Sequence, residues 1–230
     1  MYGMRMMMPG LISPLTAMTL ALLIVWYGGT AKAVTDEIGK VTRLQGTATQ
    51  LQGDDPRSLQ AGSVIRAGAV VETGAESRLQ IIFIDGSQMT LGEEARLVMD
   101  DLVYNVEASN AGAISQSFEI FAGTFRFVTG AVGREKQDAV QISTPVATIG
   151  IRGTDFFGGP LAAGMPPGQI HYGFMSISGA IDVTTLQGTV TLDEENEGTF
   201  LPMSGNAAPT PANIWDQEAI EEAYASIAFR

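Results

Sequence analysis

The side chains that most often carry chemistry are scarce in this sequence, and their spacing does not form a catalytic set. There is no cysteine, and the only histidine is His171. Without cysteine there is no disulfide framework, thiol nucleophile, thiolate zinc site or iron–sulfur cluster. A Ser-His-Asp triad would have to use His171, and the sequence has no Gly-x-Ser-x-Gly elbow. We therefore interpret His171 as a strand residue with a satisfied hydrogen bond, and predict a protein that is not an enzyme and needs no cofactor.

Acidic residues are numerous, but their spacing favours solvated turns over a catalytic or metal site. Adjacent acids such as Asp54-Asp55 point to opposite faces of a strand, so they do not readily share a glycosidase-like cleft. Asp193, Glu195 and Glu197 would share one face of an extended segment, which suits Ca²⁺. The Asp-x-Asp-x-Asp-Gly spacing of a calcium loop is absent, so calcium binding is the alternative here.

One arginine stands in unusual surroundings. Arg152 lies between Gly150 and Gly153, in an apolar stretch with almost no other charge. A guanidinium group can form forked hydrogen bonds, and glycine lets the backbone approach it closely. We expect a latch in which Arg152 holds a turn through backbone carbonyls or through Asp85 or Asp155. Capture of a ligand or partner by an exposed Arg152 is the alternative.

The elements that would position these residues are short β-strands separated by glycine turns. The segment 78–84 places Leu79, Ile81 and Phe83 on one face, and its other face is also mostly apolar. This pattern predicts a strand covered on both sides. Asp85-Gly86-Ser87 then predicts a turn, followed by a partner strand at 89–91. The fold class is therefore all-β, as a sandwich or a solenoid-like stack, with further strands at 118–121, 125–128, 140–142, 177–186 and 188–192.

The first 33 residues are typical of a secretion signal. Arg5 precedes an apolar run from Leu11 to Tyr27, and Ala31-Lys32-Ala33 supplies the small residues that signal peptidase reads. We predict cleavage before Val34, hence a periplasmic or secreted protein with no retained transmembrane helix, and an uncleaved anchor is the alternative. There is no cysteine to carry a lipid anchor.

The charge balance excludes one class of partner. The whole chain has 13 basic and 25 acidic side chains, or −12. Removing 1–33 also removes two basic residues, Arg5 and Lys32, which leaves 11 against 25, or −14. Such a surface repels nucleic-acid phosphate. We therefore expect no nucleic-acid partner.

After the predicted signal, the chain divides into three parts: an all-β domain at 34–203, a linker at 204–212 and an amphipathic helix at 213–230. The stretch 158–168 has no periodicity and predicts a loop within the domain. Asn213 is a plausible N-cap for the helix. This helix either docks on its own domain or binds a partner. In the second case the candidate contact residues are Trp215, Ile220, Tyr224 and Ile227.

Several ordered blocks resemble one known family. Thr144-Pro-x-Ala-x-Ile-Gly-Ile-Arg-Gly-Thr154 closely resembles the signature that closes a FecR-type periplasmic domain. The blocks 59–62, 71–74, 83–92 and 123–126 are similar to the family's internal blocks, in the expected order. The resemblance runs from 38 to 157, and more loosely to 201. The residues that carry it, which we expect to be structural, are Asp85, Gly86, Thr144, Pro145, Gly150, Arg152, Gly153 and Thr154.

The resemblance implies an exported all-β domain of a family named for iron-citrate signalling proteins, which control an extracytoplasmic-function sigma factor. This sequence departs from those regulators, because it shows no cytoplasmic helical segment before the apolar run and no C-terminal module that would meet a TonB-dependent transducer. We therefore expect a non-enzymatic envelope module for protein interaction, scaffolding or signalling. Its partner would be an envelope or surface protein, or a polysaccharide. The alternative is a sensor domain for a small ligand, Ca²⁺ or a polysaccharide.

Overall fold

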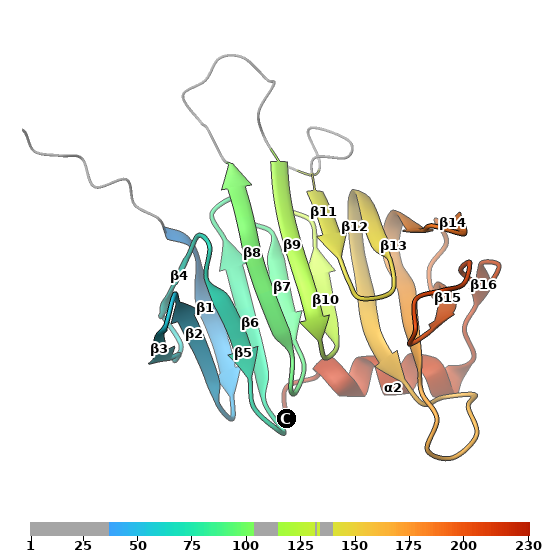
Figure 1. Ribbon diagram of the computed structural model, residues 1–230, viewed down its shortest axis with the longest axis horizontal. Helices are drawn as coiled ribbons and strands as arrows, with labels where there is room; N and C mark the ends of the chain where they lie inside the picture. The colour runs from blue at the N-terminus through green and yellow to red at the C-terminus, as the bar shows by residue number, and fades with distance from the viewer. Residues whose placement is uncertain (1–36, 104–114, 132, 134–139) are drawn as a thin grey trace, which may run out of the picture. The chain divides into compact units, whose positions relative to one another are not determined.

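A computed structural model describes residues 37–103, 115–131, 133 and 140–230, as Figure 1 shows. The predicted signal peptide and its cleavage site lie outside these residues. Within the described part of the chain, no helix is both long enough and apolar enough to cross a membrane.

The all-β prediction is confirmed, with a helix near the C-terminus (Figure 1). The strands are β1 (Glu37–Gln45), β2 (Ala48–Gln52), β3 (Asp55–Ser58), β4 (Val64–Arg66), β5 (Val70–Thr73), β6 (Arg78–Phe83), β7 (Gln88–Leu91), β8 (Arg96–Val103), β9 (Ser115–Ala122), β10 (Phe125–Val128), β11 (Val140–Ser143), β12 (Thr148–Leu161), β13 (His171–Thr185), β14 (Gly188–Leu192), β15 (Glu197–Pro202) and β16 (Asn213–Ile214), and the helix α2 spans Gln217–Ile227.

The strands form one strongly curled sheet, in the order β3-β2-β5-β8-β9-β11-β12-β10-β7-β6-β1-β4. The long strand β12 joins its two halves, because its first part pairs with β11 and its second part with β10. On its other edge β12 pairs with β13, which continues to β14 and β15.

The main core lies between the two halves of the sheet. Phe118 of β9 packs against Phe83 of β6, with ring centroids 5.1 Å apart, and against Phe127 of β10 at 5.6 Å. All three rings are buried. Such aromatic pairs add to the hydrophobic stabilisation of the core. The two halves therefore pack face to face through aromatic side chains that the chain supplies from separate strands.

The prediction that strand 78–84 is covered on both faces is wrong. Leu79, Ile81 and Phe83 are buried, but Ile82 is 37% exposed and Ile84 is 51% exposed. The sheet has one core face at this position, and the apolar residues of the other face remain at the surface. The predicted turn at 85–87 is present, with Gly86 at a φ of 81°.

A second, smaller apolar cluster lies on the outer face of the sheet, where α2 covers β12 and β13. Phe157 and Met175 contribute from the strands, and Ala219, Ala223 and Ile227 contribute from the helix. The three helical residues are spaced four apart, so they form one face of α2. The helix therefore docks on its own domain, which is one of the two possibilities that the sequence left open.

Two predicted boundaries need correction. Helix α2 begins after Asp216, which accepts a hydrogen bond from the Ala219 amide, and not at Asn213. Asn213 is instead paired with Gly198 in the sheet. The predicted loop at 158–168 also starts later, because β12 continues to Leu161, which pairs with His171. Pairing with a partner strand decided both boundaries, and local sequence patterns do not contain that information.

Candidate functional site

Three aromatic rings form a continuous stack on the outer face of β13 and β15. His171 lies parallel to Phe200, with ring centroids 4.0 Å apart and planes 11° apart. Phe200 in turn lies parallel to Trp215, with centroids 4.7 Å apart and planes 2° apart. Each ring comes from a different part of the chain: β13, β15 and the residue that follows β16. The stack therefore ties the C-terminal segment to the sheet.

Two glycines make room for the indole of Trp215. A Cβ atom at Gly173 would lie 2.6 Å from the indole Cη2 atom, and one at Gly198 would overlap the indole Nε1 atom. These glycines lie on adjacent strands, β13 and β15, so the indole lies against bare backbone. Trp215 is only 5% exposed as a result.

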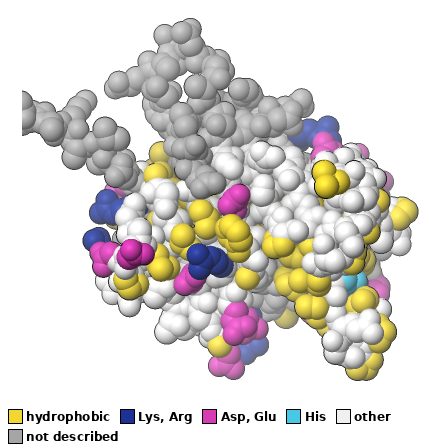
Figure 2. Space-filling view, viewed as in Figure 1, with side chains coloured by type: hydrophobic (Ala, Val, Ile, Leu, Met, Phe, Trp, Pro, Cys, Tyr) yellow, Lys and Arg dark blue, Asp and Glu magenta, His cyan; other side chains and the backbone are white. Residues whose placement is uncertain are grey.

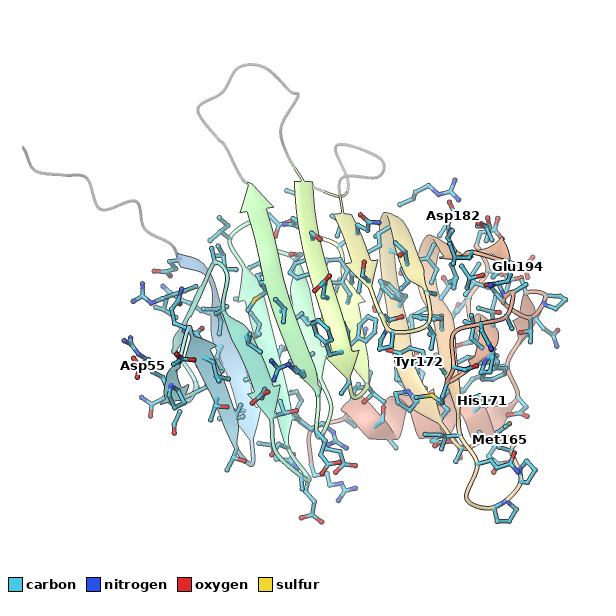
Figure 3. The ribbon with its side chains drawn as sticks, in the orientation of Figure 1. Asp55, Met165, His171, Tyr172, Asp182 and Glu194 are labelled. Carbon is cyan, nitrogen blue, oxygen red and sulfur yellow. The ribbon has the colours of Figure 1, made fainter. Side chains whose placement is uncertain are left out.

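Next to the stack lies an open cleft of about 500 Å³. The loop after β12 forms one wall through Met165, and the segment 210–216 forms the other through Pro211 and Ile214. Figure 3 shows Met165 in this loop and His171 where the loop leads into β13. Apolar side chains with a few polar groups are typical of binding sites.

Helix α2 fixes the loop that lines the cleft. The Glu222 carboxylate accepts hydrogen bonds from the amides of Ala162 at 2.9 Å and Ala163 at 2.7 Å. Burial lowers the pKa of His171 below its usual 6.5, although Glu222 and the Ala163 backbone act in the opposite direction. Burial therefore favours the neutral form of His171. It contributes a flat aromatic surface to the cleft rather than a charge.

Large exposed apolar side chains gather at this end of the domain. Ile214 lines the cleft and is 51% exposed, and Ile170, which precedes His171, is 49% exposed. Met203 follows Pro202, the partner of His171, and is 42% exposed. Figure 2 shows hydrophobic side chains around the histidine on this part of the surface. Clustered apolar side chains at a surface mark interaction sites more often than scattered ones.

The structure separates the four contact residues that the sequence proposed for the helix. Trp215 and Ile227 are buried against the sheet, so they are not available to a partner while the helix is docked. Ile220 is half-buried, and Tyr224 is 37% exposed. The exposed residues that pattern analysis missed are Ile214, Ile170 and Met203, none of which stands on the helix.

Arg152 does not form the latch through Asp85 or Asp155 that the sequence predicted. Its guanidinium donates to Asp182 Oδ1 at 2.8 Å, and both side chains are about one-third exposed. Neither expected acid is its partner. Asp155 accepts two hydrogen bonds from Arg126, at 2.7 and 2.5 Å, and Asp85 accepts from the Ser87 amide and hydroxyl. A bulge in β12 separates Arg152 from Asp155.

The other signature residues build the bend at which β12 changes neighbours. Gly153 has a φ of 66° and lies where the register of β12 against β13 shifts. Thr154 is buried, and its amide donates to the Thr129 hydroxyl at 2.8 Å while its own hydroxyl donates to the Ala180 carbonyl at 2.6 Å. Glycine adopts this left-handed backbone conformation readily, because it has no Cβ atom. The segment therefore has a structural role in joining the two halves of the sheet.

The remaining signature residues also lie in turns or in the sheet. The Thr144 hydroxyl accepts a hydrogen bond from the Ala147 amide at 3.1 Å, which closes the turn that contains Pro145. Gly150 lies in β12 opposite Asp182 of β13. Asp85 and Gly86 form the turn between β6 and β7. None of these residues lines the cleft beside the aromatic stack.

The acidic turn at 193–197 closes on itself. The Glu197 carboxylate accepts hydrogen bonds from the amides of Asp193 at 2.9 Å and Glu194 at 3.2 Å. Its oxygens therefore cap a turn. In the part of the chain that the structure describes, no group of three or more His, Cys, Asp or Glu side chains could hold a metal ion.

Comparison with known proteins assigns the domain. The model of the FecR protein family matches residues 69–191, and the chain belongs to this family. The match covers β5 to the middle of β14, including the signature segment around Gly153. No curated protein matches the chain.

Solved structures give weaker similarities. Two crystal structures of a candidate anti-sigma factor from Parabacteroides distasonis match at 13% identity, with TM-scores of 0.47 and 0.46, over 66% of this chain. This chain spans 62% of the length of that protein. A cell surface anchoring domain matches at 31% identity and a TM-score of 0.28, over 32% of this chain and 97% of its own length.

Proposed function

We propose that this FecR-family domain is a non-enzymatic protein-interaction module of the cell envelope, exported by its N-terminal segment, and that it docks its partner at the cleft beside the His171–Phe200–Trp215 stack. The observation that carries the proposal is the exposure of Ile214 at the edge of a preformed apolar cleft. An isoleucine that is half exposed beside a hollow loses water contact when a partner side chain fills that hollow, which stabilises the complex.

The charge of the domain favours a partner segment with basic residues. Asp216 is the acidic residue that lines the cleft, and the whole chain carries a net charge of −12. Opposite charges speed the encounter of two proteins and disfavour wrong partners. We therefore expect an apolar anchor side chain in the cleft, with lysine or arginine beside it.

The cleft is built to keep its shape without a partner. One wall is held by the hydrogen bonds that the Glu222 carboxylate accepts from the loop amides of Ala162 and Ala163. The other is held through Thr210, whose hydroxyl accepts a hydrogen bond from the Phe200 amide at 2.9 Å. A preorganised surface loses less conformational entropy on binding. This supports docking on a rigid surface, with Ile214 as the exposed contact.

The test compares two variants of exposed apolar residues. The protein, tagged at its C-terminus, is purified from envelope fractions as wild type, Ile214→Asp and Leu186→Asp, and the proteins that accompany it are identified. Leu186 is fully exposed in the turn between β13 and β14 and does not line the cleft, so it is the matched control. We expect one protein that is recovered with wild type and Leu186→Asp but lost with Ile214→Asp. Equal recovery with all three would contradict docking at the cleft, and recovery of polysaccharide without protein would favour the sensor alternative.

A further inference from the structure

A row of polar side chains crosses four adjacent strands on the outer face of the sheet, away from the aromatic stack. Arg43 of β1 is in register with Gln80 of β6, and Gln80 is in register with Thr90 of β7. Thr90 is in turn in register with Arg126 of β10. Register partners on neighbouring strands stand side by side on the same face. The four side chains therefore form a continuous polar strip.

The last turn of α2 converts this strip into a cleft. A hollow of about 260 Å³ lies between the row and the C-terminal segment, where Tyr224, Ile227 and Phe229 complete the lining. The Arg43 guanidinium lies 4.1 Å from the centre of the Phe229 ring, a cation–π contact that holds it at the rim of the hollow. The cleft thus combines a polar floor with an aromatic edge.

Several donors in this cleft are not used by other described residues. Thr90 is only 8% exposed, yet its hydroxyl lines the cleft with no hydrogen-bond partner among the described residues. The side-chain oxygen of Gln80 accepts from the Thr42 hydroxyl at 3.0 Å, which leaves its amide nitrogen free to donate. These donors face the open cleft, so they are free to hydrogen-bond a ligand that enters it.

Two arginines and no acidic side chain line the cleft, although the chain as a whole is acidic. Arg126 is neutralised by its bidentate pair with Asp155. Arg43 has no carboxylate within ion-pair distance in the described part of the chain, so no ion pair neutralises its charge. Burial raises the pKa of Tyr224. Arg126 lowers it, and Asp155 and Glu195 raise it further, so the Tyr224 hydroxyl stays protonated and can donate.

We propose that this cleft binds a small carboxylate, with its oxygens between Arg43 and the Thr90 hydroxyl. A guanidinium fork matches the two oxygens of a carboxylate, and the charge of Arg43 is not neutralised by an ion pair. The Gln80 amide and the Tyr224 hydroxyl supply further donors. The site is separate from the protein-docking cleft, and the proposal stands independently of the proposed function.

The test is an NMR titration of the protein purified from cells, at constant ionic strength so that general screening does not change. Acetate, glucuronate and inorganic phosphate are added separately to wild type, Arg43→Gln, Thr90→Val and Arg57→Gln. Arg57 is an exposed arginine on β3 that pairs with Asp55, so it is the matched control. Thermal melts of each variant verify that it is folded.

We expect saturable shifts at the amides of residues 80, 90 and 224 with acetate and glucuronate. Arg43→Gln should weaken this binding about tenfold and Thr90→Val about threefold, while Arg57→Gln should leave it unchanged. Tighter binding of glucuronate than acetate would identify an acidic sugar as the source, and equal binding would identify the carboxylate alone. Shifts that do not saturate, equal shifts in folded Arg43→Gln, or tighter binding of phosphate would overturn the proposal.

Discussion

The indole of Trp215 lies directly against the backbone of Gly198, with no side chain between them. Phe200, two residues along the same strand, stacks on the indole. Trp215, two residues before helix α2, is therefore packed against the sheet. This contact holds one wall of the cleft in which we place the partner.

Replacing Gly198 with alanine is expected to destabilise the domain by about 2 kcal/mol, because the new methyl group overlaps the indole and the surrounding backbone has to shift. Urea denaturation measures the free energy of unfolding. Gly188→Ala is the control, since its methyl group would meet the Ala208 Cβ atom at an ordinary 3.7 Å. Trp215→Ala should remove most of the extra cost of Gly198→Ala, and full additivity of the two changes would show that the indole is not the obstacle.

Removing the indole itself is expected to cost about 3–5 kcal/mol, as for other large buried aromatic residues. The neighbouring change Ile214→Ala should alter the free energy of unfolding by less than about 0.5 kcal/mol, because Ile214 is half exposed. Chemical denaturation of both variants provides the comparison. Similar losses for the two would mean that the C-terminal segment is not docked as described.

The two arginine–aspartate pairs near β12 should differ in strength. Asp155→Asn breaks a bidentate pair with Arg126 whose Asp155 side chain is 16% exposed, and we expect a loss of about 1–2 kcal/mol. Arg152→Ala breaks a pair with Asp182 that is more open to solvent, with an expected loss below about 1 kcal/mol. Thermal and urea melts at low and high salt test this order. A larger loss for Arg152→Ala would restore the latch that the sequence suggested.

Acid should weaken the fold in part through His171. Burial holds its folded-state pKa below the value of 6.5 that applies in the unfolded chain, so the unfolded state binds the proton more readily. The stability linked to His171 is therefore fully present above pH 6.5 and is lost as the pH falls from 6.5 toward the lower folded-state pKa. His171→Phe keeps the stack on Phe200 and removes the titration. Melting temperatures measured above and below pH 6.5 should fall less with acid for this variant, and parallel curves would contradict the assignment.

The sequence contains enough local information to predict the strands and turns of this domain. Alternation placed Leu79, Ile81 and Phe83 on one face, and these residues are buried together. It did not reveal which apolar face lacks a cover, so Ile84 was expected to be buried although it is half exposed. Burial of the second face depends on what packs there, which is a property of the whole fold.

The candidate site was less predictable, because its parts meet only after folding. The C-terminal segment was proposed as a contact, but Gly198 and Phe200 carried no signal that an indole would lie on them. The one pattern that could have indicated the indole site is a pair of glycines on neighbouring strands, Gly173 and Gly198. That pattern cannot be recognised before the pairing of the two strands is known. Arg152 stood out by its surroundings in the sequence, yet its partner Asp182 lies on a neighbouring strand.

Site-specific crosslinking in living cells tests the central claim most directly. A photoreactive amino acid is placed at position 214 in one strain and at position 186 in another, both of them exposed apolar positions. The account predicts a single protein adduct from position 214 and none from position 186, with the adduct lost when Met165→Asp places a charge in the cleft. An adduct from position 186 without one from position 214 would contradict it, because the partner would then dock away from the aromatic stack.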